Sequence, residues 1–207
     1  IVCSMESTKT TLLPSAYWAP IEYYVYLLKH CCTLEVEEYF VKQTIRSRCK
    51  IAGANNILTL HIPKVRKNSS KTLVKDLRIN HDTTWRKQHW NSIVSAYNSS
   101  PFFQYYQDDI APLYEEKPSF LLDWNNKTQE LLDSLLNLEI VLPQTDGYQK
   151  DIDGLDLRDY AFDKQALPPY TQVFSEKHGF TPHLSILDLL FNEGPNTETY
   201  LQSISLK

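Results

Sequence analysis

The chain has little of the residues that build the common nucleotide- and metal-binding motifs. It holds 5 glycines in 207 residues and contains neither GxGxxG nor a P-loop, so we do not expect a phosphate cradle built on glycine. GxSxG and HExxH are also missing from the sequence, which removes the corresponding hydrolase and zinc-protease motifs. Its 4 cysteines form no CxxC pair. This cysteine pattern predicts no zinc site and favours reduced thiols in a cytoplasmic protein.

Long apolar runs and an excess of basic residues are lacking as well. The formal net charge of −4 argues against a dedicated nucleic-acid binder. No apolar run approaches the roughly 20 residues that cross a bilayer, so we expect no membrane span. A hydrophobic content of 42% is ordinary for a folded domain. We therefore expect one domain over residues 1–207, with a flexible leader at 1–9; the oligomeric state stays open.

The first half of the chain alternates strand and helix signals. A short apolar run at 10–13 predicts a strand, and Pro20 suits the first turn of the helix that follows. β-branched and aromatic residues then predict three further strands, at 33–41, 57–63 and 72–80. Two polar segments join these strands, a basic connector at 42–56 and a solvated loop at 64–71. This half predicts a strand–helix–strand sheet.

The second half is mainly helical. Asp82, Thr83 or Thr84 can cap a helix at 85–97, and Pro112 interrupts the helix that follows. Further helices are predicted at 120–138 and 180–194, the last with Thr181 as cap. The acidic segment 143–170 is a long surface excursion or a mobile flap, because loops of this length are usually functional or mobile. The fold class predicted is mixed α/β, a single domain with an N-terminal strand–helix–strand sheet followed by a mainly helical C-terminal half.

Two clusters of residues could bind an anion. On the helix at 85–97, Arg86 shares a face with His89 and Trp90 and follows Trp85. The free N–H groups of a first helical turn already favour an anion, so a cation there needs a negative partner such as phosphate or carboxylate. The alternative is a surface arginine stacked on tryptophan, with His89 in the core. Both interpretations stay open.

The second cluster is Lys42, Arg46, Arg48 and Lys50. Alternate residues of an extended segment point the same way, so Arg46, Arg48 and Lys50 could form one cationic stripe. Arginine binds phosphate through two parallel hydrogen bonds, which suits a nucleotide, a sugar phosphate or a phosphorylated carrier. The alternative is a solvated edge strand whose charges block aggregation.

Two smaller features complete the candidates. Tyr17 and Trp18 lie in the turn after the first strand, where open α/β sheets bind ligands, although both rings could equally fill the core. Lys75 and Asp76 are adjacent and are interpreted as a structural ion pair. An acid or base role for Asp76 or His89 would need reach to a substrate.

The motifs together resemble the WbqC-like protein family of bacteria, in a form typical of Bacteroides-type members. The matching segments are, in order, LLPSAYWAPIEYYVYLLK, YFVKQTIRSRCKIAGANN, LTLHIP, KDLRI, TWRKQHWNSIVSAY, SPFFQYYQDDIAPLYEE and HGFTPHLSILDLLFNEGP. They cover nearly the whole chain and keep their order. The resemblance implies a role in O-antigen or other surface polysaccharide biosynthesis. It also implies a transferase that moves glycine or another aminoacyl group to an amino sugar.

We accordingly predict a transferase whose partner is a nucleotide sugar or another phosphorylated small molecule, with the cofactor unknown. The rival hypotheses are a non-catalytic anion- or nucleotide-sugar-binding accessory protein and a protein-interaction adaptor, so enzyme status stays open. His89 is the predicted proton handler, because an imidazole titrates near neutral pH. The residues predicted to carry the function are His89 and Asp76 for catalysis and Tyr17, Arg46, Arg48, Lys75, Trp85 and Arg86 for substrate binding.

Overall fold

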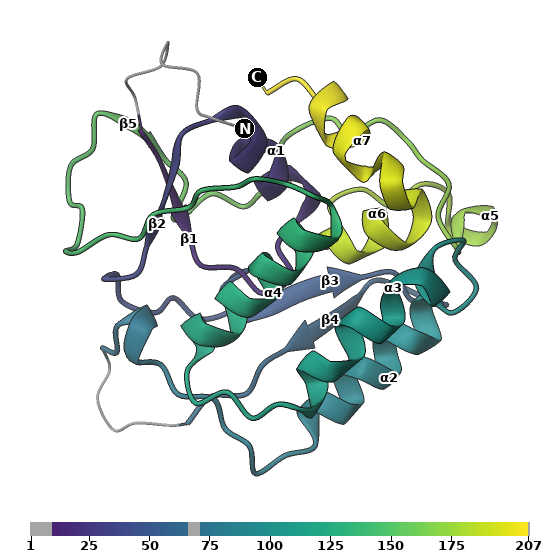
Figure 1. Ribbon diagram of the computed structural model, residues 1–207, viewed down its shortest axis with the longest axis horizontal. Helices are drawn as coiled ribbons and strands as arrows, with labels where there is room; N and C mark the ends of the chain where they lie inside the picture. The colour runs from purple at the N-terminus through teal and green to yellow at the C-terminus, as the bar shows by residue number, and fades with distance from the viewer. Residues whose placement is uncertain (1–9, 66–70, 207) are drawn as a thin grey trace.

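The computed structural model describes residues 10–65 and 71–206 (Figure 1). The predicted leader at 1–9, and the part of the predicted loop at 66–70, lie outside this range. The elements, in chain order, are β1 (Thr10–Pro14), α1 (Ile21–Lys29), β2 (Cys32–Glu35), β3 (Arg48–Ile51), β4 (Leu58–His61), the 3-10 helix η1 (Val74–Asp76), α2 (Trp85–Tyr97), α3 (Phe103–Ile110), η2 (Ala111–Glu115), α4 (Leu121–Leu135), β5 (Gly154–Asp156), α5 (Ser175–His178), α6 (Ile186–Glu193), η3 (Gly194–Asn196) and α7 (Thr197–Ser203). The mixed α/β class is confirmed.

A three-stranded parallel sheet organises the N-terminal half. Its strand order is β2-β1-β5, with β1 in the centre. The helix α1 links β1 to β2 and begins directly after Pro20, as expected for a proline that lacks an N–H to donate. From Ile21 to Leu27 every residue of α1 is buried, because the helix lies between the sheet and the helices α6 and α7 (Figure 1). All three strands run in one direction, so their carboxyl ends meet at one edge.

The strands β3 and β4 form a separate antiparallel hairpin. Cys49, Ile51 and Leu60 point into the core from one face of this hairpin. β3 lies inside the segment predicted as a connector, so that prediction is wrong over 48–51, whereas β4 confirms the strand predicted at 57–63. The predicted strand at 72–80 is also wrong, because residues 74–76 form η1 and the flanking residues make isolated bridges.

Helix α3 packs on α4 in the second half, and η2 packs on both α2 and α3 (Figure 1). Thr84 holds the N-cap position of α2 as predicted, although its side chain makes no capping hydrogen bond. α3 gives way to η2 one residue before Pro112, which confirms the predicted interruption. The last predicted helix begins later than expected. Ser185, and not Thr181, caps α6 by accepting a hydrogen bond from the Leu187 N–H.

The segment 143–170 is tied into the fold by buried carboxylates. It supplies β5, which pairs with β1, and then the strap, as we name residues 157–165. Glu22 of α1 is fully buried and accepts hydrogen bonds from the Tyr160 hydroxyl and from the N–H groups of Lys164 and Gln165. Because these donors come from two separate points of the strap, Glu22 holds the strap against α1.

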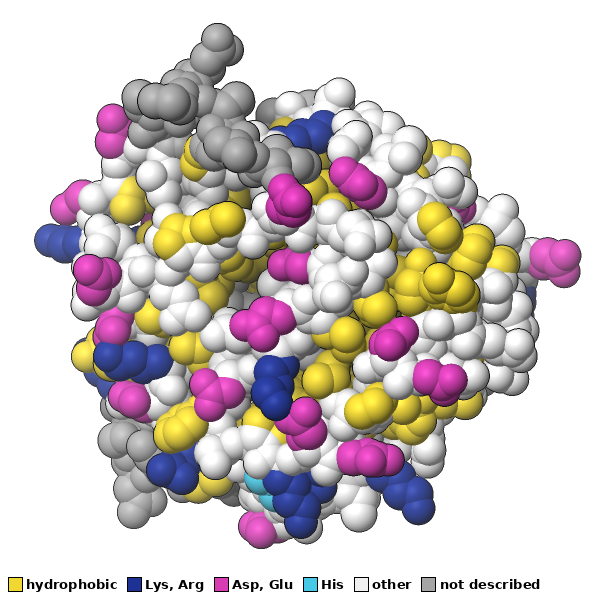
Figure 2. All heavy atoms as spheres, viewed as in Figure 1, with side chains coloured by type: hydrophobic (Ala, Val, Ile, Leu, Met, Phe, Trp, Pro, Cys, Tyr) yellow, Lys and Arg dark blue, Asp and Glu magenta, His cyan; other side chains and the backbone are white. Residues whose placement is uncertain are grey.

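The main core is a large cluster that takes residues from β1, α1, the hairpin and the C-terminal helices, and a small second cluster joins Leu34, Val36 and Leu122. Cys32 and Cys49 are buried free thiols. Cys31 is disulfide-bonded, so the expectation of reduced thiols is wrong at that residue. On the face shown in Figure 2, acidic and basic side chains are interspersed, without one continuous basic field. None of the helices in the described ranges is long and apolar enough to cross a membrane.

Candidate functional site

A cavity of about 390 Å³ opens at the carboxyl edge of the parallel sheet. Its walls come from the segments that follow the three parallel strands: Trp18 and Pro20 after β1, residues 43–46 and the β3 residues 48–50 after β2, and residues 158–163 after β5. Ligands of open α/β sheets bind at this edge, where the loops converge. The position predicted from the turn after the first strand is therefore the position of the cavity, and Trp18 lines it.

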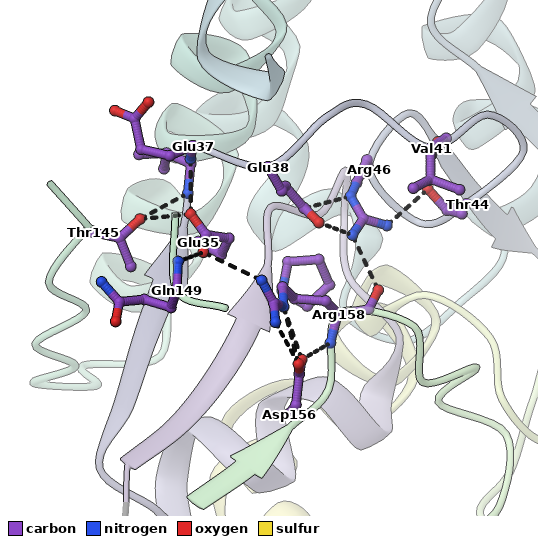
Figure 3. Close-up of polar contacts among 12 residues, drawn as sticks. Glu35, Glu37, Glu38, Val41, Thr44, Arg46, Thr145, Gln149, Asp156 and Arg158 are labelled. Carbon is purple, nitrogen blue, oxygen red and sulfur yellow. Dashed lines mark hydrogen bonds and ion pairs between the residues drawn. The ribbon is translucent and has the colours of Figure 1, made fainter. Parts of the chain in front are cut away.

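One wall of the cavity is held by a buried ion pair. The Arg46 guanidinium is 1% exposed and donates to both carboxylate oxygens of Glu38, through Nε and Nη2, each at 2.6 Å. Nη2 also donates to the carbonyl oxygen of Arg158 at 3.0 Å, and Nη1 donates to the Thr44 hydroxyl (Figure 3). The Glu38 carboxylate neutralises the charge of Arg46. Through its bond to the Arg158 carbonyl, Arg46 also joins the strap to the segment after β2.

Arg158 is fixed in a similar way from the other side of the sheet edge. Its guanidinium pairs with Asp156 at 2.5 Å and reaches Glu35 at 3.4 Å (Figure 3). Glu35 is fully buried and also accepts from Thr145 and from the Gln149 N–H. The pairing with Asp156 raises the pKa of Arg158 and lowers that of Asp156. Both buried arginines are thus structural charges at the base of the cavity.

Two other polar side chains of the cavity have no protein partner. Arg48, on β3, makes no hydrogen bond or ion pair within the described residues, and its Nε is buried. His183, just before α6, has a buried Nδ1 that is equally unpartnered in the described part of the chain. A buried donor or acceptor without a partner costs about 1–3 kcal/mol. Because both residues line the cavity, they are its candidate ligand-binding groups.

The backbone around the cavity adopts an unfavourable conformation at several points. Four non-glycine residues that line it have φ in the left-handed region: Trp18 at 39°, Gln43 at 66°, Phe162 at 52° and His183 at 60°. Such conformations are uncommon for bulky residues and cost on the order of 1–3 kcal/mol each. Strain of this kind clusters at ligand sites, where the surrounding structure imposes it.

The structure does not bring Arg86 into this cavity. Its Nη1 donates to the carbonyl oxygens of Tyr114, Glu115 and Glu116. These are the free carbonyls at the end of η2, whose partial negative charge supplies the partner that a cation in the first turn of α2 requires. Arg86 lines a different, more open depression of about 500 Å³ together with Lys87 and Trp90.

Three of the predicted residues lie in the core between these two pockets. Tyr17 is fully buried, and its hydroxyl is 2.9 Å from both His89 Nδ1 and the Tyr114 hydroxyl. The Trp18 Nε1 donates to the same Tyr114 hydroxyl at 2.9 Å. Trp85 is 2% exposed and packs edge-on against His89. The proton-handling role of His89 and the wall role of Tyr17 and Trp85 stay predictions, and none of the three lines the cavity.

Burial of His89 has a measurable consequence for stability at acid pH. Burial lowers the pKa of His89 to about 4, against about 6.5 in an unfolded chain. The folded state therefore binds the proton less readily, and the stability contributed by neutral His89 is lost as the pH falls from about 6.5 towards 4. We expect a loss of roughly 2.5 kcal/mol by pH 4.5. In thermal melts at pH 7 and pH 4.5, His89→Gln should show a smaller drop in Tm than the wild type; equal drops would contradict the assignment.

The predicted pair of Lys75 and Asp76 is arranged differently from expectation. Lys75 pairs with Glu37 at 2.5 Å, on the exposed surface of η1. Glu37 and Glu38 are neighbours in the sequence but belong to different ion pairs. Glu37 pairs with Lys75 at the surface, and Glu38 pairs with Arg46 in the interior. Neither Lys75 nor Asp76 lines the cavity, and their functional roles stay predictions.

His183 and Arg158 were not among the site residues predicted from the sequence. The motif HGFTPHLS was interpreted as the start of the last helix, which placed His183 in a first turn and hid its left-handed backbone. Arg158 lies in the segment without periodicity, and its carboxylate partner Glu35 is distant in sequence. Within the described residues, His, Cys, Asp and Glu side chains form no group that could hold a metal ion.

Comparisons with known proteins identify a relative and a family. The chain is similar to an uncharacterised protein of Mycobacterium tuberculosis, 24% identical over 197 residues, which cover 79% of this chain and 84% of that protein. No solved structure matches the chain. Residues 24–160 and 153–200 match the WbqC-like protein family. These ranges take in β2 to β5, the strap, and both Arg48 and His183, and the chain therefore belongs to the WbqC-like protein family.

Proposed function

We propose that this protein is a transferase of cell-surface polysaccharide biosynthesis, which moves glycine or another aminoacyl group to the amine of a phosphorylated or nucleotide-linked amino sugar. The observation that carries the proposal is the buried, unpartnered Nε of Arg48 in the cavity at the carboxyl edge of the sheet. A guanidinium without a carboxylate partner binds a phosphate through charge-assisted hydrogen bonds. Membership of the WbqC-like family supports the class of reaction.

The cavity offers the parts that such a transfer needs. Lys50 follows Arg48 on the same face of β3 and is exposed, so both cations can meet one phosphorylated ligand. The rings of Trp18 and Tyr160 line the walls, where they can pack against a sugar ring. A volume of about 390 Å³ is within the range of small-molecule sites. Arg46 and Arg158 position these walls and do not themselves bind the ligand.

His183 is the candidate proton acceptor. In the Nε2–H tautomer its unpartnered Nδ1 carries a lone pair. The amine of the acceptor sugar attacks the acyl carbonyl carbon, forming the C–N bond. The bond to the leaving group breaks, and its electron pair stays with that group. The proton lost by the amine passes to His183 Nδ1. Positioning of the two reactants in one cavity contributes the rest of the rate increase.

A thermal-shift screen with sugar phosphates, nucleotide sugars and aminoacyl donors tests the proposal. At 100 times its Kd, a ligand stabilises the protein by about 2.7 kcal/mol, which corresponds to a rise in Tm of roughly 5–10 °C. We expect this rise with a phosphorylated amino sugar. We expect Arg48→Ala to abolish it, because the guanidinium supplies the principal hydrogen bonds to the phosphate. Arg78→Ala is the matched control, since Arg78 is exposed and stacks on Phe120 away from the cavity.

The outcomes separate the proposed function from its rivals. Binding that depends on Arg48, followed by release of the aminoacyl donor's leaving group, supports the transferase. Binding without turnover favours a non-catalytic accessory protein. An equal shift in Arg48→Ala and in the wild type would contradict the site itself, and no shift with any ligand would leave the adaptor as the better explanation.

A further inference from the structure

The hairpin beside the cavity presents a polar face that continues beyond it. In the β3–β4 register, Arg48 lies opposite His61 and Lys50 lies opposite Thr59. Directly opposed residues share a face of a sheet, with Cβ atoms about 5 Å apart. Arg48, Lys50 and Thr59 line the cavity, whereas His61 extends the same face past its mouth.

Two lysines enlarge this surface. The pKa of His61 is lowered by burial and then by the charges of Arg48 and Lys64. The pKa of Lys64 is lowered by burial and then by the charge of Lys42. The lowered pKa leaves His61 neutral at pH 7, where it can donate one hydrogen bond, while Arg48, Lys64 and Lys42 act on their neighbours as positive charges. Lys64 also lies over the ring of Phe40, 3.8 Å from its centroid, which fixes its ammonium beside the hairpin. We call Lys42, Arg48, Lys50, His61 and Lys64 the cationic face.

No carboxylate neutralises the cationic face. None of its members forms an ion pair with any residue that the structure describes. Glu38, the nearest acidic residue along the chain, is occupied by Arg46. The cavity carboxylates Asp159 and Asp163 belong to the strap on the other wall. Like charges held together without a counter-ion are unfavourable, and a multivalent anion relieves all of them at once.

We propose that the cationic face binds the diphosphate group of the substrate, with the group that reacts held in the cavity. The inference deepens the proposed function and rests on it. A single phosphate satisfies Arg48 at the cavity mouth. The cross-strand spacing of Arg48 and His61, and the lysines beyond, extend the positive surface over a length that suits two linked phosphates. Diphosphate occurs both in nucleotide sugars and in isoprenoid carriers, so the chemistry recognised is the diphosphate itself.

Calorimetric titration with inorganic pyrophosphate and with inorganic phosphate tests this assignment. We expect pyrophosphate to bind the wild-type protein at least about tenfold more tightly than phosphate at low ionic strength, because it meets several cations. His61→Ala and Lys64→Ala should each weaken pyrophosphate binding by roughly two- to fivefold, the range of an exposed charge pair for the lysine and of one hydrogen bond for the imidazole, and should reduce the preference over phosphate. Lys127→Ala removes an exposed lysine on α4 that pairs with Glu116 and should bind pyrophosphate like the wild type. Equal affinity for the two anions, or wild-type binding by His61→Ala and Lys64→Ala, would overturn the assignment.

Two further ligands identify the source of the diphosphate. Uridine diphosphate carries the diphosphate on a nucleoside, and geranyl diphosphate carries it on an isoprenoid. The compound that binds the protein with the lower Kd identifies the source of the diphosphate. Failure of both to bind overturns the proposal. If sugar monophosphates still stabilise the protein through Arg48 while pyrophosphate shows no preference, the diphosphate assignment alone fails. If sugar monophosphates also fail to bind, the proposed function fails with it.

Discussion

Glu38→Gln is expected to lower the free energy of unfolding by about 3–5 kcal/mol, the usual cost of removing one partner from a buried ion pair. Arg46 is 1% exposed and gives two of its donors to the Glu38 carboxylate. Glutamine keeps the size of the side chain but carries no charge, so the guanidinium would remain buried and uncompensated. For a chain of this length the loss corresponds to a fall in Tm of roughly 10 °C or more.

Thermal and urea denaturation of matched variants measure this effect. Glu37→Gln is the control, because Glu37 pairs with the exposed Lys75 and such surface pairs contribute about 0–1 kcal/mol. Combining Glu38→Gln with Arg46→Met should recover much of the loss, since the double variant leaves no buried charge. If Glu37→Gln and Glu38→Gln lower the free energy of unfolding by the same amount, the buried ion pair of Glu38 and Arg46 does not stabilise the fold more than a surface pair.

The Glu38–Arg46 pair also matters for the cavity. Arg46 Nη2 donates to the Arg158 carbonyl, and the Asn125 side-chain amide donates to the Arg46 carbonyl and to Ser15. These bonds join the segments that follow all three parallel strands. The left-handed conformations of Trp18 and Phe162 lie in two of those segments. The buried polar groups therefore stabilise the strained walls, and a variant that loosens them should weaken ligand binding as well as stability.

Local pattern predicted the elements that depend on local signals. Pro20 marked the start of α1, Pro112 marked the change from α3 to η2, and the candidate caps before Trp85 predicted α2 at its observed bounds. The period of an extended chain also placed Arg48 and Lys50 on one face of β3. The same rule failed for Arg46, which precedes the strand and turns to a carboxylate.

Long-range pairing could not be read in the same way. β5 has 3 residues, all exposed, and it is a strand because β1 offers it hydrogen bonds. Glu22 and Glu35 have the appearance of surface glutamates in the sequence, yet both are fully buried because the distant strap and Arg158 supply their partners. The left-handed backbone at His183 likewise follows from the contacts of Leu184 and Ser185 with residues 19–21 and with Lys50. These features arise from the fold and leave no local signal.

His183→Gln is expected to lower kcat of the proposed transfer by about 10²–10⁴-fold, the usual contribution of a positioned general base. Glutamine approximates the length of histidine but has no basic nitrogen to accept the proton from the attacking amine. Binding of the phosphorylated ligand should change little, because Arg48 and the cationic face remain. The measurement is steady-state kinetics, in which a fall in kcat at nearly constant KM identifies a proton acceptor. A matched rise in KM would identify a residue that only binds.

His178→Gln is the matched control for this result. His178 ends the short helix α5 in the same part of the chain, and its Nε2 contacts the Ala54 carbonyl at the surface, outside the cavity. Its replacement should leave both kcat and KM unchanged. Because His183 also lies in a left-handed conformation, the melting temperatures of the two variants need to agree with that of the wild type for the comparison to hold. A kcat of His183→Gln within about threefold of the wild type would leave amine activation to another group, since loss of a general base gives a far larger effect.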